Sequence, residues 1–169
     1  MKLGSILGLG YKSKVLTILL CMALCLSACT QSGATSMEKH EYKDSTSTFC
    51  ISAPTEWSYS VEKPVLDEAG NNLYPYVGIT LLPTRDDSNV IAFMRMDEGT
   101  FELEDGADSS IKLNDSLDAT MLDSSTESMV MQTIVFSDAK YGIIIRMDVD
   151  FYGDNKAVIE DILESVEIK

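Results

Sequence analysis

The sequence contains few of the residues on which nucleophilic catalysis depends. It has a single histidine, His40, and four cysteines. His40 lies in the polar stretch 30–48, which is rich in Ser, Thr, Glu and Lys and has no apolar period, so we interpret this stretch as a flexible tether. No Ser-His or Cys-His pair is then expected inside a folded domain, and a nucleophile needs such a base beside it. We therefore predict no catalytic residues and a protein that is not an enzyme.

Long apolar runs are also scarce. The longest, Val15–Leu26, has twelve residues, whereas a helix needs about 20 to cross a bilayer core. It follows Lys2, Lys12 and Lys14, and no acidic residue occurs before Cys29. A basic segment followed by a short apolar run is typical of a secretory signal peptide, so we expect the chain to be exported.

The apolar run ends in Leu26-Ser27-Ala28-Cys29. This segment resembles the lipobox of bacterial lipoproteins, in which a branched apolar residue and two small residues precede a cysteine. The resemblance implies cleavage before Cys29, which would leave residues 1–28 as the signal peptide, and a diacylglycerol, with palmitate among its acyl chains, on the Cys29 sulfur. Two or three acyl chains anchor a protein stably, so we expect a location on the extracytoplasmic face of the cell membrane.

Basic residues are outnumbered about two to one. The formal net charge is −14, and removing residues 1–28 takes away three lysines and no acid, which gives −17 for the mature chain. Such a surface repels phosphate backbones and anionic lipid headgroups, so nucleic acid is excluded as a partner. An envelope protein or ligand is the expected partner instead.

Only one thiol is left in the mature domain. Cys21 and Cys25 leave with the signal peptide and Cys29 carries lipid, so Cys50 has no partner for an internal disulfide. Cys50 lies in an apolar stretch, where we expect it to be a small buried side chain. Residues 29–48 are predicted as the lipidated cysteine and tether, and 49–169 as a single globular domain.

Alternating apolar residues in the domain predict β-strands. A polar link at 137–140 is short enough for an antiparallel hairpin between the last two of them. The predicted strands are 49–53, 76–82, 90–96, 130–136 and 141–151, with a weaker one at 100–104.

Two segments have helical spacing instead. Val158, Ile159, Ile162, Leu163 and Val166 form an apolar stripe after a possible N-cap at position 154 or 155. A shorter helix is predicted over 115–123. The sequence thus predicts an α+β fold, with an antiparallel sheet of about five to seven strands flanked by about two helices.

Both ends of the domain carry short motifs. Phe49-x-Ile51-x-x-Pro54-x-x-Trp57 opens it, and Ile159-x-x-Ile162-Leu163-x-Ser165-Val166 closes it. Together they resemble PsbP-like domains, which begin with a strand, a proline turn and a tryptophan. Those domains end with a helix running into a Leu-x-Ser-aliphatic segment and a final short strand. The resemblance covers about 48–60 and 141–169. It implies an antiparallel sheet with helices on its faces (an α/β/α sandwich), and it carries over no catalytic residue.

Clustered carboxylates and methionines leave a metal-binding or enzymatic envelope domain open as an alternative. The acidic clusters lie at 97–98, 102–108 and 148–150, but none has the spacing of a calcium loop. Met94-x-Met96 and Met129-x-Met131 place thioethers on presumed neighbouring strands, and such ligands suit Cu⁺. Filling of core gaps is the simpler interpretation of these methionines, so no metal and no cofactor is predicted.

Tyrosines near predicted loops are the candidates for a ligand surface. Tyr59, Tyr74 and Tyr76 lie close to prolines or to the turn at 70–72. Rings at loop-to-strand junctions can be held stiffly and half exposed, so we expect these three beside a shallow cleft. The sequence therefore favours a lipid-anchored binding or protein-interaction module without an assigned ligand.

Overall fold

The computed structural model describes residues 35–63, 67–69, 76–85, 87–96, 100–101 and 109–169. All of them belong to one compact unit, 35–169. In this part of the chain, strands form two antiparallel sheets, and there is one helix. The prediction of a mostly antiparallel fold that includes a helix is confirmed at this level.

The larger sheet has seven strands, in the order β3-β4-β5-β9-β8-β7-β6. Each strand is antiparallel to its neighbours. The strands are β3 (Ser58–Glu62), β4 (Tyr76–Leu82), β5 (Val90–Met96), β6 (Ser109–Leu113), β7 (Leu117–Asp123), β8 (Met129–Phe136) and β9 (Tyr141–Asp148).

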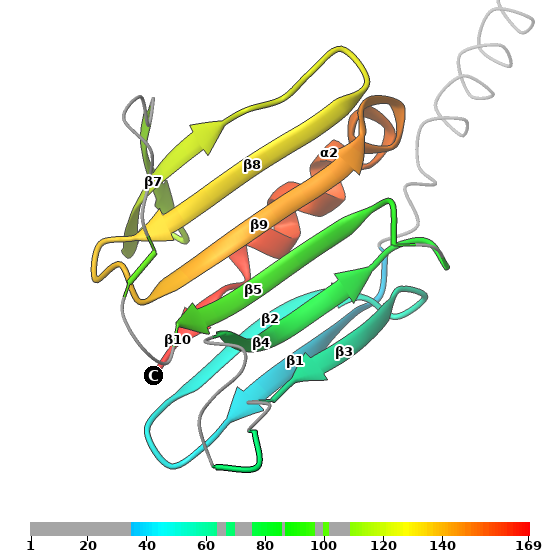
Figure 1. Ribbon diagram of the computed structural model, residues 1–169. Helices are drawn as coiled ribbons and strands as arrows, with labels where there is room; N and C mark the ends of the chain where they lie inside the picture. The colour runs from blue at the N-terminus through cyan, green and yellow to red at the C-terminus, as the bar shows by residue number, and fades with distance from the viewer. Residues whose placement is uncertain (1–34, 64–66, 70–75, 86, 97–99, 102–108) are drawn as a thin grey trace, which may run out of the picture. The chain divides into compact units, whose positions relative to one another are not determined.

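The smaller sheet and the helix lie on one side of the larger sheet (Figure 1). The smaller sheet has the order β1-β2-β10, with β1 at Met37–Lys43, β2 at Thr48–Pro54 and β10 at Glu167–Ile168. Helix α2 spans Val149–Glu164. We call the side of the larger sheet that faces α2 and the smaller sheet the inner face, and the opposite side the outer face.

The core lies between the inner face and its covering elements. Alternate residues of the central strands are fully buried there, as the two-residue period of a strand requires. Helix α2 adds Ile159 and Ile162, which have no exposed surface. Full burial of one such side chain contributes roughly 2 to 3 kcal/mol, so these contacts hold the helix in place.

Phe49 on β2 joins the two sheets at the centre of the core. Its ring stacks on Tyr42 of β1, with the ring centroids 4.9 Å apart. On its other side it meets Phe93 of β5 edge-on at 4.8 Å and Tyr141 of β9 at 5.5 Å. Aromatic pairs at these separations add about 1 kcal/mol each to the gain from burial.

Five predicted strands are present, and two of them, 76–82 and 90–96, have the predicted bounds. The hairpin through 137–140 is also confirmed, because β8 and β9 pair antiparallel. The strand predicted over 141–151 was too long, since β9 ends at Asp148 and the chain continues directly into α2. In the weaker candidate at 100–104, residues 100 and 101 are not in a strand, and the others lie outside the described residues.

The helix predicted over 115–123 is wrong, because this segment forms strand β7. Asn114 and Asp115 have φ angles of 41° and 58°, a left-handed conformation that Asn and Asp tolerate in tight turns. They turn the chain from β6 into β7. The segment expected to form a second helix is therefore the strand between β8 and β6 in the larger sheet.

The flexible tether predicted up to residue 48 is also corrected. Strand β1 occupies Met37–Lys43 and pairs along its length with β2. His40, expected to be solvated, is only 5% exposed, and Tyr42 is equally buried. The folded unit thus begins about a dozen residues earlier than predicted.

Candidate functional site

The outer face of the larger sheet is the most distinctive surface of the described residues. Cross-strand pairing places alternate residues of β4, β5, β9, β8 and β7 on this face. Six of the apolar side chains on this face form what we call the outer patch: Leu82, Val90, Met94, Leu122, Met131 and Ile144. Met131 is 41% exposed, and the other five are partly buried.

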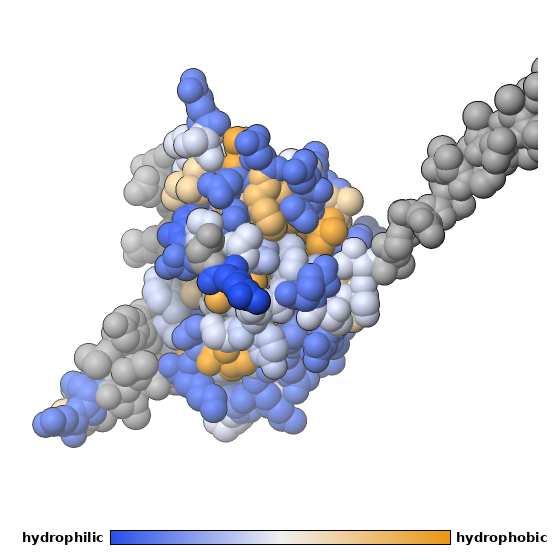
Figure 2. Space-filling model, turned by 90° about the vertical axis from the view of Figure 1, so that its right-hand side faces the viewer, coloured by the Kyte–Doolittle hydropathy of each residue, from blue (hydrophilic) through white to orange (hydrophobic). Residues whose placement is uncertain are grey.

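A sheet face in contact with water normally carries polar side chains. Here one row of paired residues crosses the sheet as Thr80, Ala92, Ile144, Thr133 and Leu122, without a single charge. At the side of the molecule shown in Figure 2, by contrast, the surface is mostly hydrophilic, with apolar residues in small separate patches. An apolar face of this extent is typical of an interaction surface.

Phe101 covers one end of the outer face. A Cβ atom added to Gly142 of β9 would lie 3.2 Å from the Phe101 ring, so the ring rests directly on this glycine. The Phe101 amide donates to the Ala139 carbonyl at 2.7 Å, and its ring lies 5.5 Å from that of Tyr76. The outer patch extends from there towards the opposite end of the strands.

Arg146 is the one charged residue near the middle of the outer face. Its guanidinium donates to the carbonyl of Asp87, in the turn between β4 and β5. This hydrogen bond holds the guanidinium beside the turn between β4 and β5.

Tyr59 lies on edge strand β3 and is 51% exposed. It pairs with Leu81, which belongs to the inner face. Its ring lies against the buried ring of His40 in β1, with the centroids 4.0 Å apart and the planes tilted by 33°. Tyr59 therefore closes the open edge between the two sheets.

Tyr76 is 37% exposed and begins strand β4. It pairs with Met96 and so belongs to the outer face, at the opposite end of β4 from the residue that pairs with Tyr59. Partial exposure of these two tyrosines was correctly expected, but a shared cleft was not, because their rings lie on opposite faces of the sheet. Tyr74 lies outside the described residues.

A polar cleft of about 500 Å³ lies at the turn between β1 and β2. Buried Arg95 of β5 is at its centre, and its guanidinium lies 2.8 Å from the Asp44 carboxylate. The guanidinium also donates to the hydroxyls of Thr46 (3.0 Å) and Ser47. The hydrogen bond from Arg95 holds the pKa of Asp44 well below its usual range. This arrangement fastens the turn to the sheet.

Sequence reasoning missed the role of Arg95, although a signal was present. Ile91, Phe93 and Arg95 alternate along β5, so a strand with an apolar inner face carries one cation on that face. A buried cation needs a carboxylate partner.

A second cleft, of about 740 Å³, lies where β9 passes into α2. Asp148, Asp150, Asp154 and Glu127 line it. Buried Asn89 organises one wall, because its amide oxygen accepts from the Asp148 backbone nitrogen at 2.9 Å. Asp150 lies in the first turn of α2, where its negative charge interacts favourably with the positive end of the helix dipole.

The clusters considered as metal ligands do not come together in the described residues. No three His, Cys, Asp or Glu side chains there are placed to hold a metal ion jointly, and the clusters at 97–98 and 102–108 lie outside this part of the chain. The two methionine pairs are not on neighbouring strands, because β9 separates β5 from β8. Asp148 and Asp150 do not share a strand face, since Asp150 belongs to α2.

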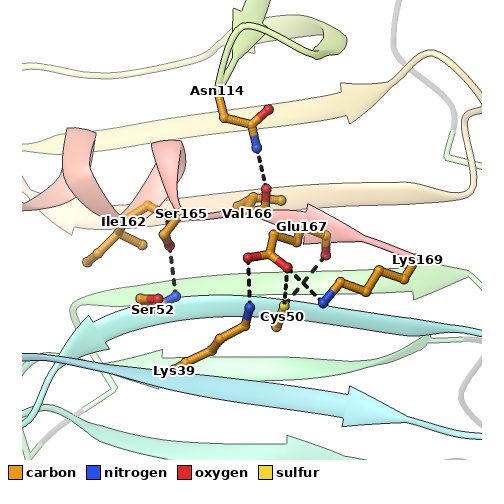
Figure 3. A network of polar contacts seen from close by, with 9 residues as sticks. All are labelled: Lys39, Cys50, Ser52, Asn114, Ile162, Ser165, Val166, Glu167 and Lys169. Atoms are coloured by element: carbon orange, nitrogen blue, oxygen red, sulfur yellow. Dashed lines mark hydrogen bonds and ion pairs between the residues drawn. The ribbon is translucent and has the colours of Figure 1, made fainter.

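A network of polar contacts joins the C-terminal segment, including β10, to β1 and β2 of the same smaller sheet (Figure 3). Glu167 lies 2.7 Å from the ammonium of Lys39 and 3.0 Å from that of Lys169. These two cations, Lys39 first, lower the pKa of Glu167 to about 2. Beneath them the buried Cys50 thiol contacts a Glu167 carboxylate oxygen at 3.7 Å, and burial raises the pKa of this thiol. The expectation of a buried Cys50 is confirmed.

The motifs at the two ends of the domain contact one another. The Ser52 amide of β2 donates to the Ser165 hydroxyl at 2.8 Å, and that hydroxyl donates to the Ile162 carbonyl at 2.6 Å (Figure 3). Trp57, after the proline turn, lies against Phe151 of α2 with the ring centroids 6.4 Å apart. Trp57 is partly buried and packs against the core cluster.

Cys29, the predicted lipid attachment site, lies outside the described residues. Within the described ranges, no helix is both long enough and apolar enough to span a bilayer. Comparison of the chain with protein families, with curated proteins and with solved structures found no match.

Proposed function

We propose that this chain is an extracytoplasmic, lipid-anchored interaction module that binds through the outer face of its larger sheet. The observation that supports binding is the outer patch, in which apolar side chains stand where a solvated sheet would carry polar ones. The anchor rests on the basic start, the short apolar run and Leu26-Ser27-Ala28-Cys29.

We also propose that the domain is PsbP-like. The contact between Ser165 and Ser52 links the two quoted motifs, and the packing of Trp57 on Phe151 links the opening motif to the first turn of the same helix. They fasten the opening strand and turn to the closing helix. This supports the resemblance at the two ends of the domain.

Crosslinking in intact cells followed by affinity capture tests the proposed function. The probe is the full-length chain with a photoreactive amino acid in place of Met131, and its control carries the same group in place of Val149 of α2. Both positions are 41% exposed, and only Met131 belongs to the outer patch. We expect discrete crosslinked products from position 131. Equal, diffuse labelling from both positions would contradict the proposal.

The alternative of a metal-dependent domain has a separate test. Isothermal titration of the purified protein with Ca²⁺, Zn²⁺ and Cu⁺ should give no stoichiometric binding. Tight binding of one ion per chain would favour the alternative.

A further inference from the structure

We infer that the outer face is covered by a second copy of this chain, in a symmetric dimer with the two larger sheets packed face to face. This inference rests on the proposed function, because it names the partner of the same surface. The argument uses charge, area and the position of the central strand.

Charge distinguishes the outer face from the rest of the molecule. On the strands, the charged residues that point to this face are Glu62, Lys112, Asp118, Arg146 and Asp148. These two bases and three acids give a net charge of −1, whereas the whole chain carries −14. A cationic partner would bind the acidic surfaces elsewhere on the molecule and not this nearly neutral face. The outer face is where two acidic copies can approach with little direct repulsion.

The area of the face suits a dimer. Seven strands of five to eight residues, spaced by about 4.8 Å and averaging about 23 Å in length, give a projected area of roughly 650 Å². A stable complex buries roughly 800 Å² per partner, and side-chain relief adds to the projected value. Antiparallel sheets pack face to face about 10 Å apart, with the side chains of the two faces interdigitated. The methionines at positions 94 and 131 are suited to such packing because their side chains adapt to irregular gaps.

The symmetry of a homodimer makes a specific geometric prediction. Strand β9 is the fourth of the seven strands, and Ile144 lies near its middle on the outer face. In a two-fold arrangement the same patch contacts itself, so residues near the axis meet their own copies. A two-fold axis that lies in the plane between the two sheets and passes over the centre of the face brings the two Ile144 side chains together.

Crosslinking through a single cysteine tests this geometry in the full-length, membrane-bound chain. Ile144→Cys introduces a thiol at the centre of the outer face, and Val149→Cys introduces one at an exposed position off the face. Cys50 is buried and gives little background. Membranes are treated with a short bismaleimide. We expect a product of twice the monomer mass from Ile144→Cys, and at least about tenfold less from Val149→Cys.

A second variant connects the product to the outer patch. Met131→Glu, added to Ile144→Cys, places like charges from both copies in the interface and should reduce the dimer product by at least about tenfold. Val149→Glu added to the same background should leave it unchanged. Melting of Met131→Glu close to that of the parent establishes that the variant is folded. Raising NaCl from about 0.05 to 0.5 M should increase the product, because salt screens repulsion between two acidic copies.

The possible outcomes separate this inference from the proposed function. A product with the mass of a different partner would overturn the dimer and leave the interaction module standing. Absence of a dimer product from Ile144→Cys would overturn the dimer, because a bismaleimide must join the two introduced thiols. The interaction module would then be decided by photocrosslinking from position 131, which needs no cysteine in the partner.

Discussion

The Asp44 carboxylate and the Arg95 guanidinium form an ion pair across 2.8 Å, and this pair holds the turn between β1 and β2 against strand β5. Both side chains are mostly buried, so Arg95 would be left inside the protein without its carboxylate if Asp44 were neutralised. Asp44→Asn should therefore lower the free energy of unfolding at pH 7 by about 2 kcal/mol, as measured by urea denaturation.

The same pair predicts a pH dependence. The pKa of Asp44 is lower in the folded chain than its ordinary value of 3.8, so the stability it contributes is fully present above about pH 4 and is lost as the pH falls below that value. Asp44→Asn should lose less stability than the parent between about pH 4 and pH 2. Asp118→Asn is the control, because Asp118 pairs only loosely with Lys112, at 3.9 Å on the surface. An equal acid response of parent and Asp44→Asn would contradict this prediction.

Two glycines should respond in opposite ways to replacement by alanine. A Cβ atom at Gly78 of β4 would lie 2.4 Å from the Phe93 carbonyl oxygen, so Gly78→Ala must push two central strands apart. We expect it to cost at least about 2 kcal/mol. Gly153 lies inside α2 with nothing within 4 Å of such an atom, and Gly153→Ala should stabilise the protein by about 0.5 to 1 kcal/mol. Thermal melting of both variants tests this prediction. A higher melting temperature for Gly78→Ala than for Gly153→Ala would contradict the packing described around these two glycines.

Helix α2 depends on Ile162, which has no exposed surface. Ile162→Asp would bury a carboxylate among apolar side chains, which few domains tolerate, so we expect an unfolded chain. The exposed neighbour Asp161 supplies the control, and Asp161→Ala should fold normally. Circular dichroism and melting distinguish the two. A folded Ile162→Asp would mean that α2 does not pack through this residue.

Cys50 should react slowly with thiol reagents while the protein is folded. Its side chain is buried, and burial raises its pKa, so the reactive thiolate is both rare and inaccessible. Reaction with a chromogenic disulfide should be at least about a hundredfold slower in buffer than in denaturant. If residues 1–28 are removed and Cys29 carries lipid, as proposed, Cys50 is the free thiol of the mature chain, which is the form to measure. Fast reaction in buffer would contradict the burial.

Lipidation is expected to depend on a single sulfur. Cys29→Ser should abolish labelling by an alkyne fatty acid, because the thioether cannot form without that atom. Cys50→Ser should keep full labelling. Label retained by the Cys29→Ser chain would rule out Cys29 as the attachment site.

Strands with regular apolar alternation were predictable from the sequence, and those without it were not. In β1, Glu38, His40 and Tyr42 share one side of the strand, of which His40 and Tyr42 are buried and Glu38 is exposed, so this side gives no apolar period. The segment gains its strand structure from pairing with β2, which the local sequence cannot show. The wrong helix over 115–123 has a different cause, which is the spacing of its apolar residues Leu117 and Met121. Residues four apart share a side in a helix and also in a strand, so their spacing did not distinguish the two.

The candidate surface was harder to predict than the core. The three tyrosines were predicted as a ligand surface because they lie near loops. The faces of the sheet on which Tyr59 and Tyr76 lie are set instead by the cross-strand register. The outer patch draws residues from five strands, and their common face is set by the sheet order. Met94 and Met131 were noticed as possible copper ligands, and the order of β5, β9 and β8 instead makes them separate parts of one apolar surface.

The early start of strand β1 has a consequence for encounters in the envelope. With lipid on Cys29, eight residue steps separate the anchor from Met37, and even a fully extended chain of this length spans only about 27 Å. The folded unit would then search a thin layer above the bilayer, and its collisions would be lateral ones between molecules held at the same height. Such confinement raises the local concentration of neighbours, so a contact too weak to detect in dilute solution can be occupied at the membrane surface.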